Sequence, residues 1–241
     1  MWTARSRYGD AGRLPGHGRG RDAAVTYLVP AVAGLLGLLV GLVVAAVLAG
    51  RPAHRPRVQR PRDVLLPVLS AAACAALAVR FGLAPELPAY LYLALVAVPL
   101  AAVDVQQHRL PDLLTLPSYP IGVGLLALAA PFIEGGGRRL LGVLLGMLGL
   151  GLCYGLLHLV NRDGMGLGDV KLAGVLGAYL GWLGPDTWVV GAFLGVLFGG
   201  LFALALLVLR VADRRSRIPF GPFMLAGALV AVLVSGYELL G

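Results

Sequence analysis

The chain has 241 residues, of which 59% are hydrophobic and only 13% are charged, and its mean hydropathy is +0.85. A soluble domain carries roughly a quarter of charged residues, so the composition excludes a soluble protein and predicts an all-α, polytopic membrane protein. The formal net charge of +8 does not indicate nucleic-acid binding, because the arginines lie in short segments between apolar runs, where they determine topology and contact membrane lipids.

The first part of the chain, residues 1–24, is polar and contains five arginines, so we expect a disordered basic tail. Residues 25–241 are expected to form a single transmembrane domain. The apolar run after the tail is too long for the core of a cleavable signal peptide and predicts a retained span from Tyr27 to Ala49. A basic loop broken by prolines follows at 50–63 and cannot be helical throughout.

Seven further apolar segments predict seven more spans, each close to the roughly 20 residues that a bilayer core requires. These segments are 64–81, 88–104, 113–132, 139–160, 170–184, 187–209 and 219–240. The segment 170–184 is short and rich in glycine, which predicts a tilted or partial span. Its glycines Gly174, Gly177 and Gly181 would let neighbouring helices pack tightly.

The distribution of lysine and arginine predicts the orientation of these spans. Most arginines fall in the connections 50–63, 105–112, 161–169 and 210–218, which the positive-inside rule places in the cytoplasm. The basic amino-terminal tail disagrees, because an even number of spans leaves it outside. We follow the internal loops, which place both Asp104 and Asp169 at the cytoplasmic face.

Asp104 and Asp169 are the two residues best suited to chemistry. Asp104 ends one apolar run, and Asp169 begins another after a glycine-dense turn. Two carboxylates from separate helices, with no metal ligands nearby, are typical of an aspartyl protease. At about 3–5 Å apart they would resist double ionisation and share one proton. The ionised group would take a proton from water, and the protonated one would donate to the carbonyl oxygen of the scissile peptide.

The sequence also allows structural roles for the same residues. Asp104 could pair with Arg109 or be hydrated. Asp169 could cap its helix and bind Lys171, and this cation and the helix N-terminus would both favour the ionised carboxylate. Lys171 is expected to anchor Asp169 or lipid phosphates, and Asp112 is expected to be a helix N-cap.

The segment 217–223 (Arg-Ile-Pro-Phe-Gly-Pro-Phe) opens the last span. Its residues Pro219, Gly221 and Pro222 predict either a stretch of non-helical backbone, covered by protein or water, or a simple proline helix start. Both interpretations stay open.

Three segments together resemble the type IV prepilin peptidases. Residues 166–172 (Gly-Leu-Gly-Asp-Val-Lys-Leu) are similar to the GxGD signature of that family, followed by Gly-x-x-x-Gly at 177–181. The segment from Asp104 to Pro117 resembles the one that carries the family's first catalytic aspartate, and 218–223 is similar to its final motif. The resemblance covers roughly residues 64–240.

The resemblance implies an aspartyl endopeptidase of the bacterial plasma membrane with GxGD architecture. It would cleave the leader peptide of prepilin-like precursors, such as type IV pilins, tight-adherence pilins and competence pseudopilins, at the cytoplasmic face. Asp104 and Asp169 would be the catalytic pair, and no metal or cofactor would be needed. The site would be shaped by Gly166, Gly168, Lys171, Asp112, Pro219, Gly221 and Pro222.

One departure from the family concerns methylation. Many members carry a large insertion after the first span with paired Cys-x-x-Cys zinc motifs, which is associated with methylating the new amino terminus. Here that place holds only the loop 50–63, and the two cysteines, Cys74 and Cys153, lie in apolar runs. We therefore expect a peptidase without N-methyltransferase activity.

Two other functions are alternatives to the peptidase. A proton- or cation-coupled transporter would use intramembrane aspartates, but it predicts acidic residues near the bilayer midplane and an internal repeat. Asp104 and Asp169 instead fall at span ends on one predicted face. An inactive homologue that serves as an assembly factor is disfavoured because both aspartates are present.

Overall fold

The structure is a computed structural model that describes residues 19–49, 61–160, 165–209 and 219–235. Within these residues the chain forms eight α-helices, one short 3-10 helix and no strand. In chain order the elements are α1 (Arg19–Ala49), α2 (Pro61–Phe81), α3 (Leu87–Gln107), α4 (Asp112–Ala129), η1 (Ala130–Phe132), α5 (Gly136–Val160), α6 (Leu167–Leu183), α7 (Pro185–Val208) and α8 (Gly221–Val234).

The prediction of an all-α membrane protein is confirmed. In the described part of the chain, six helical segments are long and apolar enough to cross a membrane, namely α1, α2, α3, α4 with η1, α5 and α7. Helices α6 and α8 have only 17 and 14 residues. The break between α6 and α7 lies at Gly184, whose φ of 125° only glycine adopts readily, followed by Pro185. The eight expected spans correspond to six long helices and the two shorter helices α6 and α8, and α6 covers the segment 170–184 that was expected to be short.

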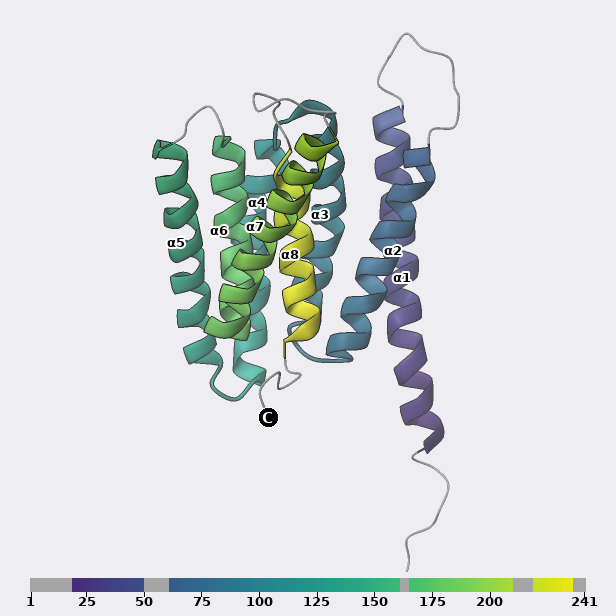
Figure 1. The fold of residues 1–241 in the computed structure, drawn as a ribbon. Coiled ribbons are helices and arrows are strands. Elements are labelled where there is room, and N and C mark those ends of the chain that lie inside the picture. Colours follow the sequence, from purple (N-terminus) through teal and green to yellow (C-terminus); the bar gives the residue numbers. More distant parts are fainter. Residues whose placement is uncertain (1–18, 50–60, 161–164, 210–218, 236–241) are drawn as a thin grey trace, which may run out of the picture.

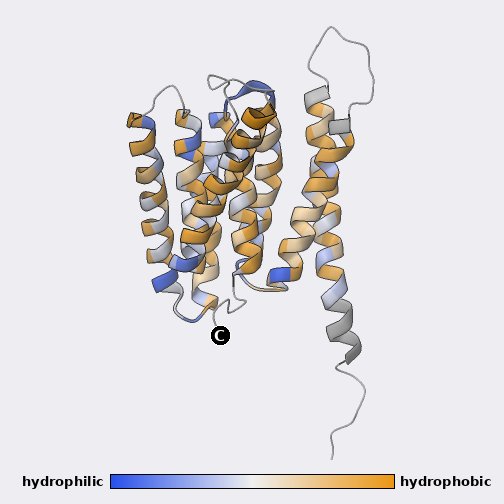
Figure 2. Ribbon diagram, in the orientation of Figure 1, coloured by the Kyte–Doolittle hydropathy of each residue, from blue (hydrophilic) through white to orange (hydrophobic). Residues whose placement is uncertain are grey.

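Consecutive helices alternate in direction, so the end of α3 and the starts of α4, α6 and α8 lie together at the upper end of the bundle (Figure 1). Hydrophobic residues cover the length of the helices, and hydrophilic ones gather at the two ends (Figure 2).

Helix α1 begins at Arg19, within the expected tail, and α2 begins at Pro61, within the expected loop. Residues 1–18 and 50–60 lie outside the described residues.

Helix α6 is the central helix of the bundle. Every residue from Leu172 to Trp182 is buried, which is typical of a helix that is hydrophobic on all sides. Gly177 and Gly181 face α5, where an added Cβ would collide with the carbonyl oxygens of Gly146 and Gly142. This contact confirms that glycines of the segment 170–184 let a neighbouring helix approach closely.

A buried hydrogen bond sets the level of α3 relative to α6. The hydroxyl of Tyr90 donates to the carbonyl oxygen of Tyr179 over 2.8 Å. From this contact Asp104 lies about 21 Å along α3 and Asp169 about 15 Å back along α6, at a rise of about 1.5 Å per residue. Because the two helices run in opposite directions (Figure 1), both aspartates arrive at the same end of the bundle.

Candidate active site

Asp104 lies in the last turn of α3 and is only 4% exposed. The helix ends just beyond it, because His108 takes a left-handed conformation with φ of 51° and donates its N–H to the carbonyl oxygen of Asp104 over 2.7 Å. Oδ2 of Asp104 accepts a hydrogen bond of 3.0 Å from the amide of Gly221. The carboxyl group is therefore held inside the protein by α8, neither hydrated at a surface nor paired with Arg109, which is exposed.

Asp169 is the third residue of α6, and Gly166 is the N-cap of that helix. Its Oδ2 accepts a hydrogen bond of 3.2 Å from the Gly166 amide. Burial and then the charge of Asp104 raise the pKa of Asp169 to about 6, against a smaller lowering by the Gly166 hydrogen bond. The pKa of Asp169 is therefore raised although the carboxyl group lies at the N-terminus of α6, contrary to the expectation that this position favours the ionised carboxylate. The charge of Asp104, at the end of α3, thus acts on the ionisation of Asp169, at the start of α6.

Two expectations about the neighbouring charged residues are wrong. Lys171 does not bind Asp169, because its Nζ lies 2.6 Å from Oδ1 of Asp112 instead. Asp112 is not an N-cap either. Pro111 occupies that position, and Asp112 is the first residue of α4. The ion pair joins the start of α4 to the first turns of α6, beside Asp169.

A second contact between α4 and α6 was not anticipated from the sequence. The hydroxyl of Tyr119 donates to the carbonyl oxygen of Lys171 over 2.6 Å, and the same hydroxyl fills the space where a side chain on Gly174 would stand. A tyrosine two turns into an apolar helix gives no sequence signal for this role, because its partner is a backbone group.

The glycines of the site leave room for Leu110, which is buried between the ends of the helices. A Cβ on Gly168 would stand 2.9 Å from Cβ of Leu110. A Cβ on Gly221 would stand 2.7 Å from Oδ2 of Asp104 and 3.5 Å from Cδ2 of Leu110. By contrast, a Cβ on Gly166 would meet only ordinary contacts, 3.6 Å from Oδ2 of Asp169. Gly168 is therefore required for the close approach of α6 to Leu110, and Gly221 is required for the close approach of α8 to Asp104.

The start of α8 supports the simpler of the two interpretations of this segment. Pro219 and Phe220 precede the helix, Gly221 is its first residue and Pro222 lies in its first turn, as in an ordinary proline helix start. The first amides of a helix have no partner within that helix. The Gly221 amide is consequently free to bind Asp104, whereas Pro222 has no N–H to offer.

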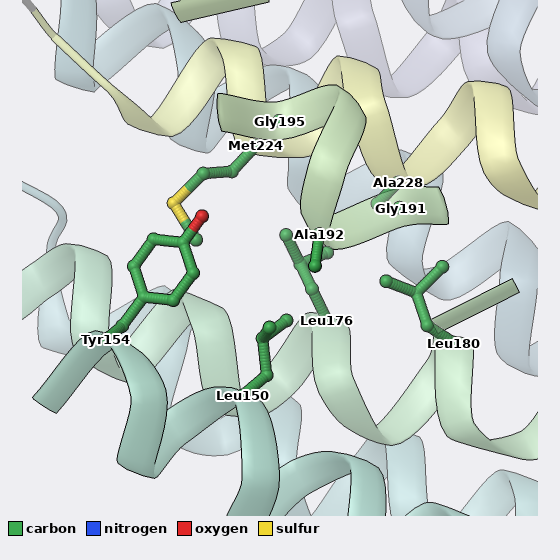
Figure 3. A pocket seen from close by; sticks show the side chains of 9 residues that line it. All are labelled: Leu150, Tyr154, Leu176, Leu180, Gly191, Ala192, Gly195, Met224 and Ala228. Carbon is green, nitrogen blue, oxygen red and sulfur yellow. The ribbon is translucent and has the colours of Figure 1, made fainter. Parts of the chain in front are cut away.

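A small cavity of about 10 Å³ lies among α5, α6, α7 and α8. Figure 3 shows the ring of Tyr154 from α5 pointing towards the side chain of Met224 from α8, with leucines of α5 and α6 below them. This volume is close to the space of a single water molecule. The cavity has no room for a peptide, so a substrate would have to contact the aspartates from the end of the bundle or after helices move.

The described residues contain no cluster of three or more histidine, cysteine, aspartate or glutamate side chains that could hold a metal ion.

Nδ1 of His158, near the end of α5, lies 2.7 Å from the carbonyl oxygen of Met165, just before α6. This contact joins the end of α5 to the residue that lies shortly before α6.

Comparison with known proteins identifies the family. The sequence profile of the type IV leader peptidase family matches residues 90–234, more than half of the chain. The prepilin leader peptidase/N-methyltransferase of Aeromonas salmonicida is 35% identical over 148 residues, which are 60% of this chain and 48% of that protein. The enzymes of the same name from Aeromonas hydrophila and Pseudomonas aeruginosa are 34% and 32% identical, over 71% and 64% of this chain and 56% and 51% of theirs.

The chain spans about half the length of these curated relatives. No solved structure matches the chain significantly. Neither the family nor these relatives support the alternative of a transporter. The matched segment contains Asp104, Asp169 and Gly221, the residues that meet at the upper end of the bundle. On this match the chain belongs to the type IV leader peptidase family.

Proposed function

We propose that the chain is a membrane aspartyl endopeptidase that cleaves the leader peptide from prepilin-like precursors, with Asp104 and Asp169 as the catalytic pair. The observation that carries the proposal is the position of these aspartates, which come from α3 and α6 and lie close enough for one charge to raise the pKa of the other. The substrate class follows from relatives named prepilin leader peptidase/N-methyltransferase.

In the proposed reaction the two carboxyl groups share one proton. Each carboxyl group accepts a hydrogen bond from one backbone amide, Asp104 from Gly221 and Asp169 from Gly166. Because burial and then the charge of Asp104 raise the pKa of Asp169, we assign the shared proton to Asp169. Asp104 takes a proton from water, the oxygen attacks the peptide carbonyl carbon, and Asp169 donates its proton to the carbonyl oxygen. Asp104 then returns its proton to the leaving nitrogen as the C–N bond breaks, and Asp169 recovers a proton from the collapsing hydroxyl.

The cytoplasmic position of this site is also a proposal. The segments 50–63, 105–112, 161–169 and 210–218 join helices at the end of the bundle where the aspartates lie, and they carry most of the arginines of the chain. Positively charged connections stay in the cytoplasm. A leader peptide would therefore reach Asp104 and Asp169 from the cytoplasm of a bacterium.

We further propose that the chain does not methylate its product. The segment 50–63 contains no cysteine, and the two cysteines of the chain lie in separate helices, Cys74 in α2 and Cys153 in α5. A test is to express the chain with a prepilin and to measure the mass of the processed amino terminus. A methylated terminus would contradict this part of the proposal without affecting the peptidase.

The peptidase itself is tested by expressing a prepilin with the wild-type chain, with Asp104→Asn or with Asp169→Asn. We expect cleavage before the hydrophobic helix of the prepilin with the wild type and none with either variant, at equal amounts of chain in the membrane. Gly124→Ala is the matched control, because a Cβ at this position meets no atom within 4 Å. Normal processing by either aspartate variant would remove the proposed mechanism.

A further inference from the structure

A groove of about 710 Å³ lies between α5 and α7, at the end of the bundle opposite to Asp104 and Asp169. The last turn of α6 forms its floor, and leucines and glycines of α5 form one wall. Glu134, Arg138 and Arg139 lie at its mouth, where α5 begins. We propose that this groove binds one phospholipid that carries both a phosphate and a primary ammonium group in its headgroup.

The interior of the groove suits an acyl chain. Leu141 and Leu145 line it and are 55% and 61% exposed. Trp188 closes the far end, because its Nε1 donates to the carbonyl oxygen of Gly146 over 3.1 Å and its ring lies 3.2 Å from where a Cβ of Gly149 would stand. From Arg138 to Gly149 the helix rises about 16 Å, which matches most of the length of an extended acyl chain.

The mouth carries charges of both signs. Arg139 is already engaged, since its Nη1 lies 3.9 Å from Oε1 of Glu86 and its guanidinium lies over the ring of Trp182. Arg138 and Glu134 are exposed, and neither has an ion-pair partner among the described residues. Arg138 can therefore bind a lipid phosphate, and Glu134 can bind the ammonium group beside it. A headgroup with one charge of each sign complements this pair better than a purely anionic one.

The position of the groove favours a lipid over a soluble ligand or a protein helix. Both α5 and α7 are apolar enough to cross a membrane, so the groove between them opens towards the hydrocarbon. The volume corresponds to a pocket for a small molecule, and a narrow acyl chain fits it more closely than a helix about 10 Å across. In a bilayer the ligand that is always present and fits these dimensions is a phospholipid chain.

The test uses the purified 241-residue chain in detergent with an equimolar mixture of dioleoyl phosphatidylethanolamine, phosphatidylglycerol and phosphatidylcholine. Native mass spectrometry counts the lipids that stay bound. We expect one retained phosphatidylethanolamine. Arg138→Gln should lower the retained fraction about fivefold, as expected for about 1 kcal/mol per arginine near a membrane surface. Glu134→Gln should shift the preference towards phosphatidylglycerol.

Filling the groove tests its location. Leu145→Trp should displace the lipid, whereas Leu144→Trp, at a residue of the same helix that is 48% exposed but does not line the groove, should leave it bound. Equal retention of all three lipids, or equal loss in both tryptophan variants, would overturn the proposal. A change in oligomeric mass with Leu145→Trp, with no change in bound lipid, would also overturn it and indicate that a second copy covers the groove.

Discussion

The amide of Gly221, the first residue of α8, donates a hydrogen bond of 3.0 Å to Oδ2 of Asp104 at the end of α3. The bond joins residues 117 positions apart in the chain, and it is available only because the first amides of a helix lack partners within that helix. The position of α8 therefore determines the orientation of one of the two proposed catalytic carboxyl groups.

The first prediction concerns the space around this bond. In Gly221→Ala the added Cβ would stand 2.7 Å from Oδ2 of Asp104, so the carboxyl group must move. We expect the rate of prepilin cleavage to fall about 10- to 100-fold, since a displacement of about 1 Å can have an effect of this size. The rate is measured with equal amounts of membrane-inserted chain. Gly200→Ala, where a Cβ meets nothing within 4 Å, should retain the wild-type rate. Equal rates for both variants would contradict this role of Gly221.

A second prediction concerns the ion pair between Lys171 and Asp112, whose side chains are 36% and 58% exposed. An exposed ion pair contributes about 0–1 kcal/mol, so Asp112→Asn should lower cleavage by no more than about fivefold. The double variant Asp112→Lys with Lys171→Asp, which exchanges the two charges, should recover part of the cleavage rate that Asp112→Asn loses. If Lys171 instead binds Asp169, Lys171→Met alone would be far more damaging than Asp112→Asn, and the exchange would rescue nothing.

The third prediction concerns the packing of α5 against α6. In Gly146→Ala the new methyl group would meet the carbonyl oxygen of Gly177, which forces the helices apart. Overpacking of this kind costs about 1–3 kcal/mol, so the melting temperature of the purified chain in detergent should fall. Gly137→Ala, at an open position on the same helix, is the control. An unchanged melting temperature in Gly146→Ala would show that the two helices are not in this contact.

A fourth prediction follows from the pKa of about 6 for Asp169. The raised pKa means that Asp169 keeps its proton below pH 6 and loses it as the pH rises through that value. If this proton is the one donated to the carbonyl oxygen, kcat/KM should fall on the alkaline side through an ionisation at or above pH 6. The profile is measured with a purified chain and a prepilin peptide between pH 4 and 9. A fall centred near pH 4, where an ordinary aspartate ionises, would exclude Asp169 as the proton donor.

The meeting of Asp104 with Asp169 could be predicted from the sequence for a simple physical reason. Each aspartate lies at the edge of an apolar run, and antiparallel spans of similar length return their edges to the same face. Counting the runs was sufficient to place both residues at one end of the bundle. The break between α6 and α7 could also be predicted, because the apolar segment 170–184 ends and the segment 187–209 begins close to Gly184 and Pro185, whose backbone conformation ends α6.

The partners of the other site residues could not be predicted from local patterns. Lys171 lies two positions after Asp169, and residues so close on a helix point to different sides. Its actual partner, Asp112, is brought near by the packing of α4 against α6. Tyr119 and Gly221 act through backbone groups. Such contacts depend on how helices are arranged in three dimensions, and no spacing along one helix indicates them.

The most direct test of the account is the rate of leader cleavage by the purified chain in liposomes, compared among Asp104→Asn, Asp169→Asn and Asp112→Asn. All three remove one carboxylate from the same end of the bundle, and Asp112→Asn serves as the control for the loss of a carboxylate there. We predict that the first two lose activity by at least about 10³-fold, within the range of acid–base catalysis, while Asp112→Asn stays within about fivefold of the wild type. Cleavage at the wild-type rate by either Asp104→Asn or Asp169→Asn would contradict the account.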